Sequence, residues 1–306
     1  MTRPHHEPRP ECWTCIMDIS TGAVNRAIGD EDLKFELMHD VARTMVSDLD
    51  RETNLPALST KIFRMISNRT GNPDPFREEK DECNRIARPL AEAISEGILE
   101  IDDPNLRIER AALATIAGNT MDLGTSGHSF DLESFEDEYH RTLDEGLAVN
   151  DAEELVDLSV EVDHVLYLAD NAGEIAFDRI LVRALSELGT DVTVAVKGGP
   201  VSNDATLRDA EYVGMNQVAT VITTGTDHLG VNFEESSREF LDIFDSAGLI
   251  LSKGQSNFET LVYDFERLAC PVAFVLKTKC GPIARSLNVS LGANVLKVVS
   301  PAPHDR

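Results

Sequence analysis

Lysine is scarce in this sequence, and the charge balance is strongly acidic. Only 8 of the 306 residues are Lys, against 20 Arg and 54 acidic residues, so the formal net charge is −26. This charge argues against non-specific nucleic-acid binding, which requires a cationic surface. The acidic residues are spread along the chain, and a carboxylate-rich, lysine-poor surface stays hydrated in concentrated salt. The composition is typical of salt-accumulating halophilic archaea, which concerns habitat and says little about chemistry.

The chain also lacks long apolar runs and the apolar core of a secretory leader. No apolar stretch approaches the roughly 18 residues of a membrane span, and the N-terminal segment MTRPHHEPRPECWTC is polar. We therefore expect a cytoplasmic protein that binds neither membrane nor nucleic acid. A hydrophobic content of 42% over 306 residues suits one large domain or two ordinary ones. The oligomeric state cannot be read from the sequence.

Cysteine is too sparse for a disulfide framework in a protein expected to be intracellular. Cys12 and Cys15 form a lone C-x-x-C motif among the five cysteines. A structural zinc site takes four ligands, so Cys83, His5 or His6 would have to complete one. A thioredoxin-like role needs the motif at a strand-to-helix junction, which the N-terminal segment does not resemble. Packing, a stray thiol pair and metal binding stay open as interpretations.

Several catalytic motifs are missing, and each absence excludes a class of enzyme. No G-x-G-x-x-G follows the first expected strand, which argues against a dinucleotide-binding domain. The chain has no G-x-x-x-x-G-K-[ST], G-x-S-x-G or H-E-x-x-H motif. The first strand also lacks the D-x-D of phosphatases that form an aspartyl-phosphate. These absences exclude P-loop NTPases, typical α/β-hydrolases and the commonest zinc proteases.

The periodicity changes near residue 150, and we expect a helical domain at 1–150 and an α/β domain at 151–306. In the first part, apolar residues recur at helical spacing, and helices are expected at 31–50, 56–70, 75–98 and 106–122. In the second part, strands are expected at 164–170, 191–198, 219–225, 248–254, 272–278 and 294–300, with helices between them. Apolar strands alternating with helices predict a doubly wound, mostly parallel sheet in a three-layer α/β/α domain.

Ligands of such a sheet bind outside the carboxyl ends of its strands, and this sequence places polar residues there. Asp170 and Asn171 follow the first strand. Four of the eight lysines also lie at strand exits, and they are Lys197, Lys253, Lys277 and Lys279. Because lysine is otherwise scarce, chance is a poor explanation for this placement. We expect one edge of the sheet to bind an anion together with a cation.

Phosphate and a hard divalent metal fit this edge best. Lysine binds phosphate as a point charge, and Gly254 would let backbone N–H groups approach an anion at a helix N-terminus. Asp170 beside phosphate would repel it unless a metal such as Mg²⁺ or Mn²⁺ lay between them. Asp204 and Asp209 are further acidic candidates, although a surface position is expected for Asp209. The alternative interpretation is structural: Asp170 and Asn171 form a turn and cap the N-terminus of the following helix, without binding a ligand.

Seven motifs in order resemble those of the damage-control phosphatase family, formerly a domain of unknown function. They cover nearly the whole chain: CWTC at 12–15, TGNPDPFREEK at 70–80, AGNTMDLG at 117–124, LADNAGE at 168–174, GGPVSNDAT at 198–206, SKGQSNFE at 252–259 and LKTKC at 276–280. The resemblance implies a metal-dependent phosphatase with a helical N-terminal region and a Rossmann-like C-terminal domain. The N-terminal C-x-x-C motif points to the prokaryotic and archaeal branch.

The resemblance also implies roles for particular residues. Asp170, Asn171 and Asp204 match the residues that bind the divalent metal, which would be Mn²⁺, Co²⁺, Ni²⁺ or Mg²⁺. Lys253 and Asn257 match the motif beside the substrate phosphate.

Two further motifs match the family less closely or without an assigned role. Lys279 looks like the lysine of the family's Arg-Thr-x-Lys motif, although Lys277 stands in the general place of the arginine and the spacing differs. Asn119 and Asp122 match a motif of the helical region and would support the site or the fold.

The reaction implied is hydrolysis of phosphomonoesters of small metabolites, either sugar phosphates or damaged phosphometabolites. Asp170, Lys253 and Glu174 would be the catalytic residues, with the metal activating water and Lys253 and Lys279 neutralising phosphoryl charge. Glu174 would either orient the water or favour the start of its own helix. The alternatives are a non-catalytic regulatory protein that binds a phosphometabolite or nucleotide, and a zinc- or redox-regulated protein centred on Cys12 and Cys15.

Overall fold

One mixed sheet organises the computed structural model, which describes residues 6–119 and 132–301. Within those residues seven strands lie in the order β1-β7-β6-β5-β2-β3-β4, and every neighbouring pair is parallel except β6 and β7. The strands are β1 (Val149–Asn150), β2 (His164–Leu168), β3 (Asp191–Val196), β4 (Thr220–Thr223), β5 (Leu249–Lys253), β6 (Val272–Lys277) and β7 (Asn294–Val299). The predicted doubly wound α/β class is confirmed.

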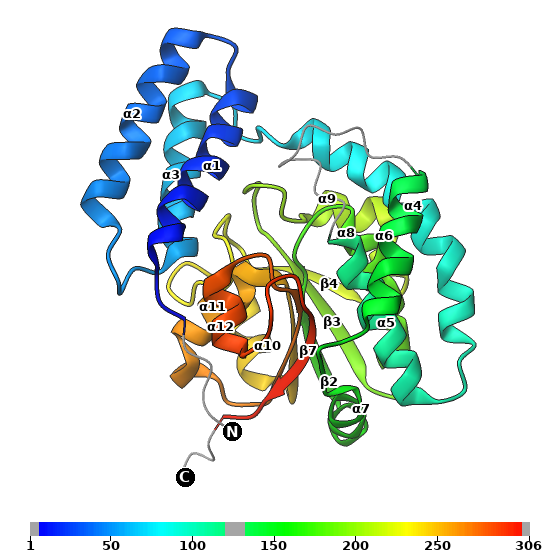
Figure 1. The fold of residues 1–306 in the computed structure, drawn as a ribbon. Helices are drawn as coiled ribbons and strands as arrows, with labels where there is room; N and C mark the ends of the chain where they lie inside the picture. The colour runs from blue at the N-terminus through cyan, green and yellow to red at the C-terminus, as the bar shows by residue number, and fades with distance from the viewer. Residues whose placement is uncertain (1–5, 120–131, 302–306) are drawn as a thin grey trace.

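Helices cover both faces of the sheet, and three more stand to one side of it (Figure 1). In chain order they are α1 (Pro10–Ala27), α2 (Glu31–Asp48), α3 (Leu55–Thr70), α4 (Arg77–Leu99), α5 (Pro104–Gly118), α6 (Leu132–Glu145), α7 (Ala152–Glu161), α8 (Glu174–Ser186), α9 (Leu207–Val213), α10 (Arg238–Ser246), α11 (Gly254–Tyr263) and α12 (Gly281–Leu287). The four N-terminal helices expected from periodicity correspond to α2, α3, α4 and α5.

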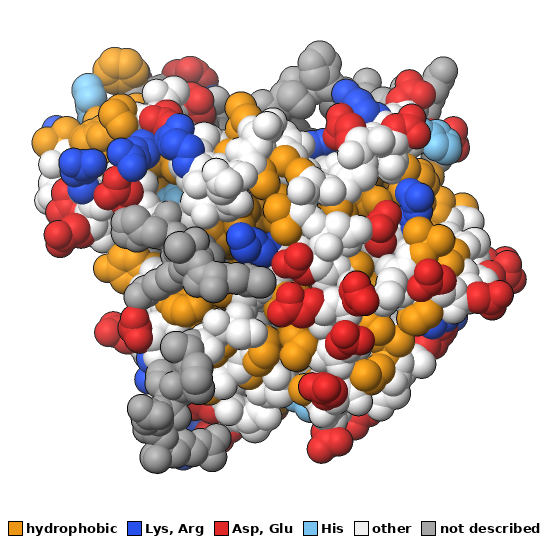
Figure 2. Space-filling model, turned by 60° about the horizontal axis from the view of Figure 1, so that its bottom comes forward, with side chains coloured by type: hydrophobic (Ala, Val, Ile, Leu, Met, Phe, Trp, Pro, Cys, Tyr) orange, Lys and Arg blue, Asp and Glu red, His pale blue; other side chains and the backbone are white. Residues whose placement is uncertain are grey.

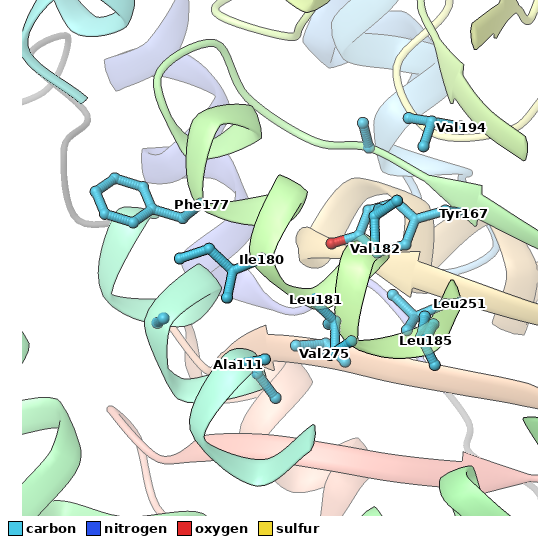
Figure 3. Packing of buried hydrophobic residues seen from close by; sticks show 14 of the residues in the cluster. Ala111, Tyr167, Phe177, Ile180, Leu181, Val182, Leu185, Val194, Leu251 and Val275 are labelled. Atoms are coloured by element: carbon cyan, nitrogen blue, oxygen red, sulfur yellow. The ribbon is translucent and has the colours of Figure 1, made fainter. Parts of the chain in front are cut away.

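Strands β2, β3, β5, β6 and β7 are mostly apolar because both of their faces are buried. In β2, Val165 and Tyr167 point into one hydrophobic cluster, and Leu166 and Leu168 point into another. Helices α4, α5, α7, α8 and α9 contribute to the first cluster, and α10, α11 and α12 to the second. Figure 3 shows Leu181 and Leu185 of α8 beside the strand residues Val275 and Leu251, and Ala111 of α5 belongs to the same cluster.

Helices α1, α2 and α3 form their own hydrophobic cluster, which includes Leu37, Val41 and Ile62. Val201 and Leu229 from the loops after β3 and β4 also belong to it, so these helices rest on the carboxyl side of the sheet. Helices α4 and α5 instead share the core of the sheet. The predicted boundary near residue 150 stays a prediction, since the N-terminal helices divide between two cores.

Strand order locates the crevice where a ligand is expected. The chain passes from β2 to β3 and β4 on one side, and then crosses to β5 on the other side of β2. Such a reversal opens a crevice outside the carboxyl ends of the two central strands. Residues 169–174 after β2 therefore lie next to residues 253–254 at the end of β5.

The described surface is acidic, as the composition indicates. Asp and Glu side chains are scattered over the face shown in Figure 2 and do not form a single patch. Among the described residues, no helix has the length and apolarity that crossing a membrane would take.

Phe177 tests the packing of α8 on α5. Its side chain is fully buried, and a Cβ atom added to Gly118 of α5 would lie 2.6 Å from its ring. Phe177→Ala should therefore lower the free energy of unfolding by about 3–5 kcal/mol, as truncation of buried aromatic residues does. Phe35→Ala, at a position that is 70% exposed, should change it by less than about 0.5 kcal/mol. Denaturant unfolding measures both, and equal losses would contradict this packing.

Candidate active site

The three residues predicted to bind metal are brought together by backbone hydrogen bonds between two loops. Asn171, after β2, and Asp204, after β3, form an antiparallel bridge. The Ala205 N–H donates to the Asp170 carbonyl at 2.8 Å, and the Ala172 N–H donates to the Asn203 carbonyl at 2.9 Å. The side chains of Asp170, Asn171 and Asp204 therefore start from adjacent points of one rigid framework.

Helix α4 fixes both loops through one buried amide. Asn84 donates from Nδ2 to Asp209 Oδ1 at 2.8 Å, and its Oδ1 accepts the Gly173 N–H at 2.8 Å. The other Asp209 oxygen accepts from the backbone N–H and the hydroxyl of Thr206, at 2.8 and 2.6 Å. The surface position expected for Asp209 is wrong, because its carboxylate caps α9 and is also tied to α4.

Gly254, the first residue of α11, brings β5 against Asp170. Its φ is +74°, which favours glycine, and a Cβ atom at this position would lie 1.9 Å from Asp170 Oδ2. The backbone at Gly254 therefore lies against the carboxylate of Asp170. The predicted contact of Gly254 with the substrate phosphate stays a prediction. Any larger residue would displace Asp170 or the start of α11.

A buried ion cluster lies behind Asp170. Lys253 is fully buried, and its Nζ donates to Glu174 and lies 3.2 Å from Asp178 Oδ1. Burial opposes the charge on Lys253, but the carboxylates of Asp178 and Glu174 outweigh it and raise the pKa of the lysine. Lys253 was predicted to bind phosphate, and in this structure its ammonium group is held by two carboxylates. Asp178 was missed because it reads as one polar residue in an amphipathic helix.

Two amides complete the hydrogen bonding of Asp170 and Glu174. Asn119, at the end of α5, donates to Glu174 and to Asp170 Oδ2, the latter at 3.1 Å. Asn171 donates to the same two groups, at 2.9 Å to Asp170 Oδ2 and 3.1 Å to Glu174 Oε2. Glu174 is thus held by side chains of the site, and Gly173 supplies the N-cap position of α8 without a side chain. Asp122 lies outside the described residues.

The buried carboxyl groups at this edge of the sheet outnumber the buried lysines near them. Four carboxyl groups are buried here, those of Asp170, Glu174, Asp178 and Asp204, and the buried lysines near them are Lys253, Lys197 and Lys80, of which Lys80 pairs with Asp74. Burial, reinforced by Glu174 and Asp204, raises the pKa of Asp170 well above its ordinary value. Burial also raises the pKa of Asp204 and of Asp178 to about 6, against the opposing effect of the nearby lysines. Carboxylates that are buried with too few cations favour a bound divalent metal.

The side-chain oxygens of Asp170, Asn171 and Asp204 are of the kind that a hard metal prefers, although they do not surround one common point. Asp170 and Asp204 offer carboxylate oxygens, and the amide of Asn171 would have to turn over to offer its oxygen instead of its NH₂ group. Residues 6–119 and 132–301 contain no group of three or more His, Cys, Asp or Glu side chains already arranged to hold a metal ion. The predicted site combines two carboxylates with an amide.

The four lysines at the strand ends do not all point toward the carboxylates of the candidate site. Lys197 donates to the Gly230 carbonyl at 2.6 Å and lies 3.6 Å from Asp204 Oδ2. Lys279 donates to the Asn119 carbonyl at 3.1 Å, and its charge lowers the pKa of Asp170. Lys277 turns away to α6 and pairs there with two glutamates. The expected convergence therefore includes Lys197, Lys253 and Lys279, and Lys277 does not take part.

Asn257 lies inside the fold. It is buried, and its Nδ2 donates to the backbone carbonyls of Ala169 and Lys253, at 3.0 and 2.9 Å. Both N–H groups of the amide are used in this way, so Asn257 ties β2 to α11. Its predicted contact with the substrate phosphate stays a prediction.

Lys80 is a further cation near the site that the motif analysis did not assign. It is buried in α4, lies 2.9 Å from Asp74 Oδ2, and its charge lowers the pKa of Asp204. Both residues belong to the segment TGNPDPFREEK, which was noted for its resemblance alone.

A cavity of about 670 Å³ lies beside the loop that carries Asp204. It is lined by α3, by the segment before α4 that contains Asp74, and by the residues after β3 and β4. Arg64 lines it and pairs with Asp227 and Glu235 at 2.5 Å each. The volume is in the range of small-molecule sites, and the polar part of the wall combines Arg64 and three carboxylates with hydroxyl and amide groups.

A family model and several relatives of known sequence match this chain over most of its length. The model of the damage-control phosphatase ARMT1-like domain matches residues 9–295. A protein of Archaeoglobus fulgidus named damage-control phosphatase is 33% identical, over 95% of this chain and 98% of its own length. An uncharacterised protein of Methanocaldococcus jannaschii is 36% identical, over 94% of each chain.

A solved structure agrees with the sequence relatives. A crystal structure of a DUF89 family protein from Pyrococcus horikoshii has a TM-score of 0.84 and 32% sequence identity, covering 95% of this chain and 99% of its own. A protein of the same organism named damage-control phosphatase is 34% identical, over 93% of this chain and 96% of its own length. Together these comparisons support a phosphatase role.

Lys253 and Lys277 provide a matched pair of substitutions at strand exits. Lys253→Met leaves Glu174 and Asp178 buried without their cation, which should cost about 3–5 kcal/mol of stability. Lys277→Met removes ion pairs at a partly exposed rim and should cost about 1 kcal/mol or less. Urea unfolding at neutral pH measures both. If the two variants were equally stable, the buried ion cluster would not have the importance assigned to it.

Proposed function

This chain belongs to the family of damage-control phosphatase ARMT1-like domains, and we propose that it is a metal-dependent hydrolase of phosphomonoesters of small metabolites. The substrate class we propose is sugar phosphates or damaged phosphometabolites. The observation that carries the proposal is the set of four carboxyl groups buried at the switch point of the sheet, near which lie three buried lysines, one of them already paired with Asp74.

Asp170, Asn171 and Asp204 would hold the divalent metal. Their oxygens suit Mg²⁺ and Mn²⁺, and a site with oxygen ligands also accepts Co²⁺ or Ni²⁺ with different affinity. A metal bound there would polarise a phosphoryl oxygen and lower the pKa of a coordinated water. Its charge would offset the burial and mutual repulsion that raise the pKa values of Asp170 and Asp204.

The remaining polar groups would position the reactants. Lys279, on the exposed rim, is placed to neutralise charge on the phosphoryl oxygens. Lys253 holds Glu174 in the site together with the amides of Asn119 and Asn171. Glu174 is thereby oriented to accept a hydrogen bond from an attacking water, which is the role of a general base or a water-positioning group.

The rest of the substrate would occupy the cavity beside Asp204. The loop from Gly198 to Ser202 lines the cavity and leads directly to Asp204. Carboxylates such as Asp227 accept hydrogen bonds from hydroxyl groups, which suits a polyhydroxylated leaving group. A metabolite of sugar size fits a cavity of about 670 Å³.

Hydrolysis of p-nitrophenyl phosphate tests the proposal. After chelation in high salt the protein should be inactive, and adding back Mn²⁺, Co²⁺, Ni²⁺ or Mg²⁺ singly should restore turnover. Asp170→Asn and Asp204→Asn should lower kcat/KM by more than about 100-fold, beyond the usual 10–100-fold cost of losing an outer hydrogen-bond partner of a metal ligand. Asp163→Asn, an exposed residue just before β2, should leave activity unchanged.

Activity on this ester would then justify a screen of sugar phosphates and other phosphorylated metabolites. A folded, metal-loaded protein that binds such compounds without hydrolysing any of them would contradict the proposal. It would support instead a regulatory protein that binds phosphometabolites or nucleotides.

A further inference from the structure

Three charged residues, Arg64, Asp227 and Glu235, form a triad in the wall of the cavity beside Asp204 (the wall triad). Arg64 of α3 donates from Nε to Asp227 Oδ1 at 3.0 Å and from Nη1 to Glu235 Oε1 at 3.1 Å. Its Nη2 lies 2.5 Å from an oxygen of each carboxylate and donates to Thr226 Oγ1 at 3.3 Å. The triad therefore joins α3 to the segment after β4.

Backbone packing fixes the two carboxylates in this wall. A Cβ atom added to Gly199 would lie 3.2 Å from Asp227 Cβ, so the loop after β3 lies directly against Asp227. The Gly198 N–H also donates to the Thr226 carbonyl at 2.9 Å. The Thr226 hydroxyl donates in turn to Glu235 Oε2 at 3.0 Å. The carboxylates are thus held by the loops that form the cavity, as well as by the guanidinium.

The loop after β3 connects this wall to the proposed metal site. Val201 and Ser202 line the cavity, and the Val201 carbonyl accepts the Asp204 N–H at 3.1 Å. A turn closed by such a bond keeps the Cα atoms at its two ends within about 7 Å of each other. A phosphoryl group bound near Asp204 would therefore place the rest of its ester within reach of the cavity.

The wall triad carries one unit of net negative charge, because it combines one guanidinium with two carboxylates. Hydrogen bonding to Arg64 lowers the pKa of Glu235 to about 2, so this carboxylate is ionised throughout the neutral and mildly acidic range. The third carboxylate of the cavity wall, that of Asp74, pairs with Arg77 and Lys80 at 2.7 and 2.9 Å. It adds no uncompensated negative charge to the cavity.

The wall triad offers acceptors to a ligand more readily than donors. Every guanidinium nitrogen of Arg64 already donates to Asp227, Glu235 or Thr226. Both bonds from Arg64 to Asp227 go to Oδ1, which leaves Oδ2 to accept from a ligand. Carboxylate oxygens accept hydrogen bonds from hydroxyl and ammonium groups, whereas a second anion would be repelled.

We propose that Asp227 and Glu235, held by Arg64, select phosphomonoesters whose leaving group carries hydroxyl or amino groups and no second anionic group. This inference rests on the proposed phosphatase function and specifies which phosphorylated metabolites the site accepts. A bisphosphate or the phosphate of a sugar acid would bring a second negative charge against the wall triad. Specificity of this kind comes from repulsion of the wrong ligand as much as from attraction of the right one.

Two phosphate esters that differ in one group test the proposal. Sorbitol 6-phosphate and 6-phosphogluconate share an open carbon chain, and the first has a hydroxymethyl group where the second has a carboxylate. The kcat/KM of sorbitol 6-phosphate should be higher by about 10-fold or more at the lowest salt concentration at which the protein stays folded. The ratio should fall as salt is added, because the wall triad is partly exposed. Glucosamine 6-phosphate should likewise be a better substrate than glucose 6-phosphate.

Substitutions of opposite sign should shift this ratio in opposite directions. Asp227→Asn combined with Glu235→Gln removes both negative charges and frees Arg64 to bind an anion, so the ratio should fall to about 1 or lower. Arg64→Met leaves both carboxylates without their cation, so the ratio should rise. Glu239→Gln, at an exposed position of α10, makes the same change as Glu235→Gln outside the cavity and should leave the ratio unchanged. Circular dichroism checks that each variant is folded.

Hydrolysis of p-nitrophenyl phosphate separates this inference from the phosphatase function, because this ester has no charge beyond its phosphate. A protein that hydrolyses it but treats sorbitol 6-phosphate and 6-phosphogluconate alike overturns the selection and leaves the phosphatase function standing. The selection also fails if Arg64→Met and the double variant shift the ratio in the same direction. A protein that hydrolyses none of these esters contradicts the phosphatase function. Calorimetric binding of the same two compounds then decides whether the wall triad selects against a second anion.

Discussion

The burial of negative charge at the carboxyl edge of the sheet is the constraint on which the rest of the site depends. Asp170, Glu174, Asp178 and Asp204 are withdrawn from water, and burial raises the pKa of Asp170, Asp178 and Asp204. Such groups stay charged inside a fold only when something else stabilises their charged form. Lys253 does this for Glu174 and Asp178. A divalent metal would do it for Asp170 and Asp204.

Both halves of the chain build this edge. The sheet supplies the loops that carry Asp170 and Asp204, while α4 and α5 supply Asn84 and Asn119, which hold those loops and their carboxylates. The N-terminal helices α1, α2 and α3 close the side where the cavity lies. Hydrogen bonds from both halves of the chain therefore hold the carboxylates in place, and the cavity lies next to them against α1 and α3.

The sequence revealed six of the seven strands because they are largely apolar, and it missed β1, a two-residue strand at the edge of the sheet. It revealed Asp170, Asn171 and Asp204 because strand ends and family motifs coincide there. It did not reveal α1, whose start follows a segment rich in Pro and His and whose buried face consists mainly of small residues. Lys253 and Lys277 have different partners because a different helix packs near each strand end. The residues next to each lysine in the sequence do not reveal which helix this is.

Calorimetric titration of Mn²⁺ into the chelated protein tests the central claim most directly, because it measures binding without requiring a known substrate. The account predicts one Mn²⁺ site per chain in wild type, the same site in Asp163→Asn, and none in Asp170→Asn or Asp204→Asn. Equal binding by wild type and Asp170→Asn would contradict it, as would a wild-type protein that binds neither Mn²⁺ nor Mg²⁺. The buried carboxyl groups would then be stabilised by protonation and by lysine alone.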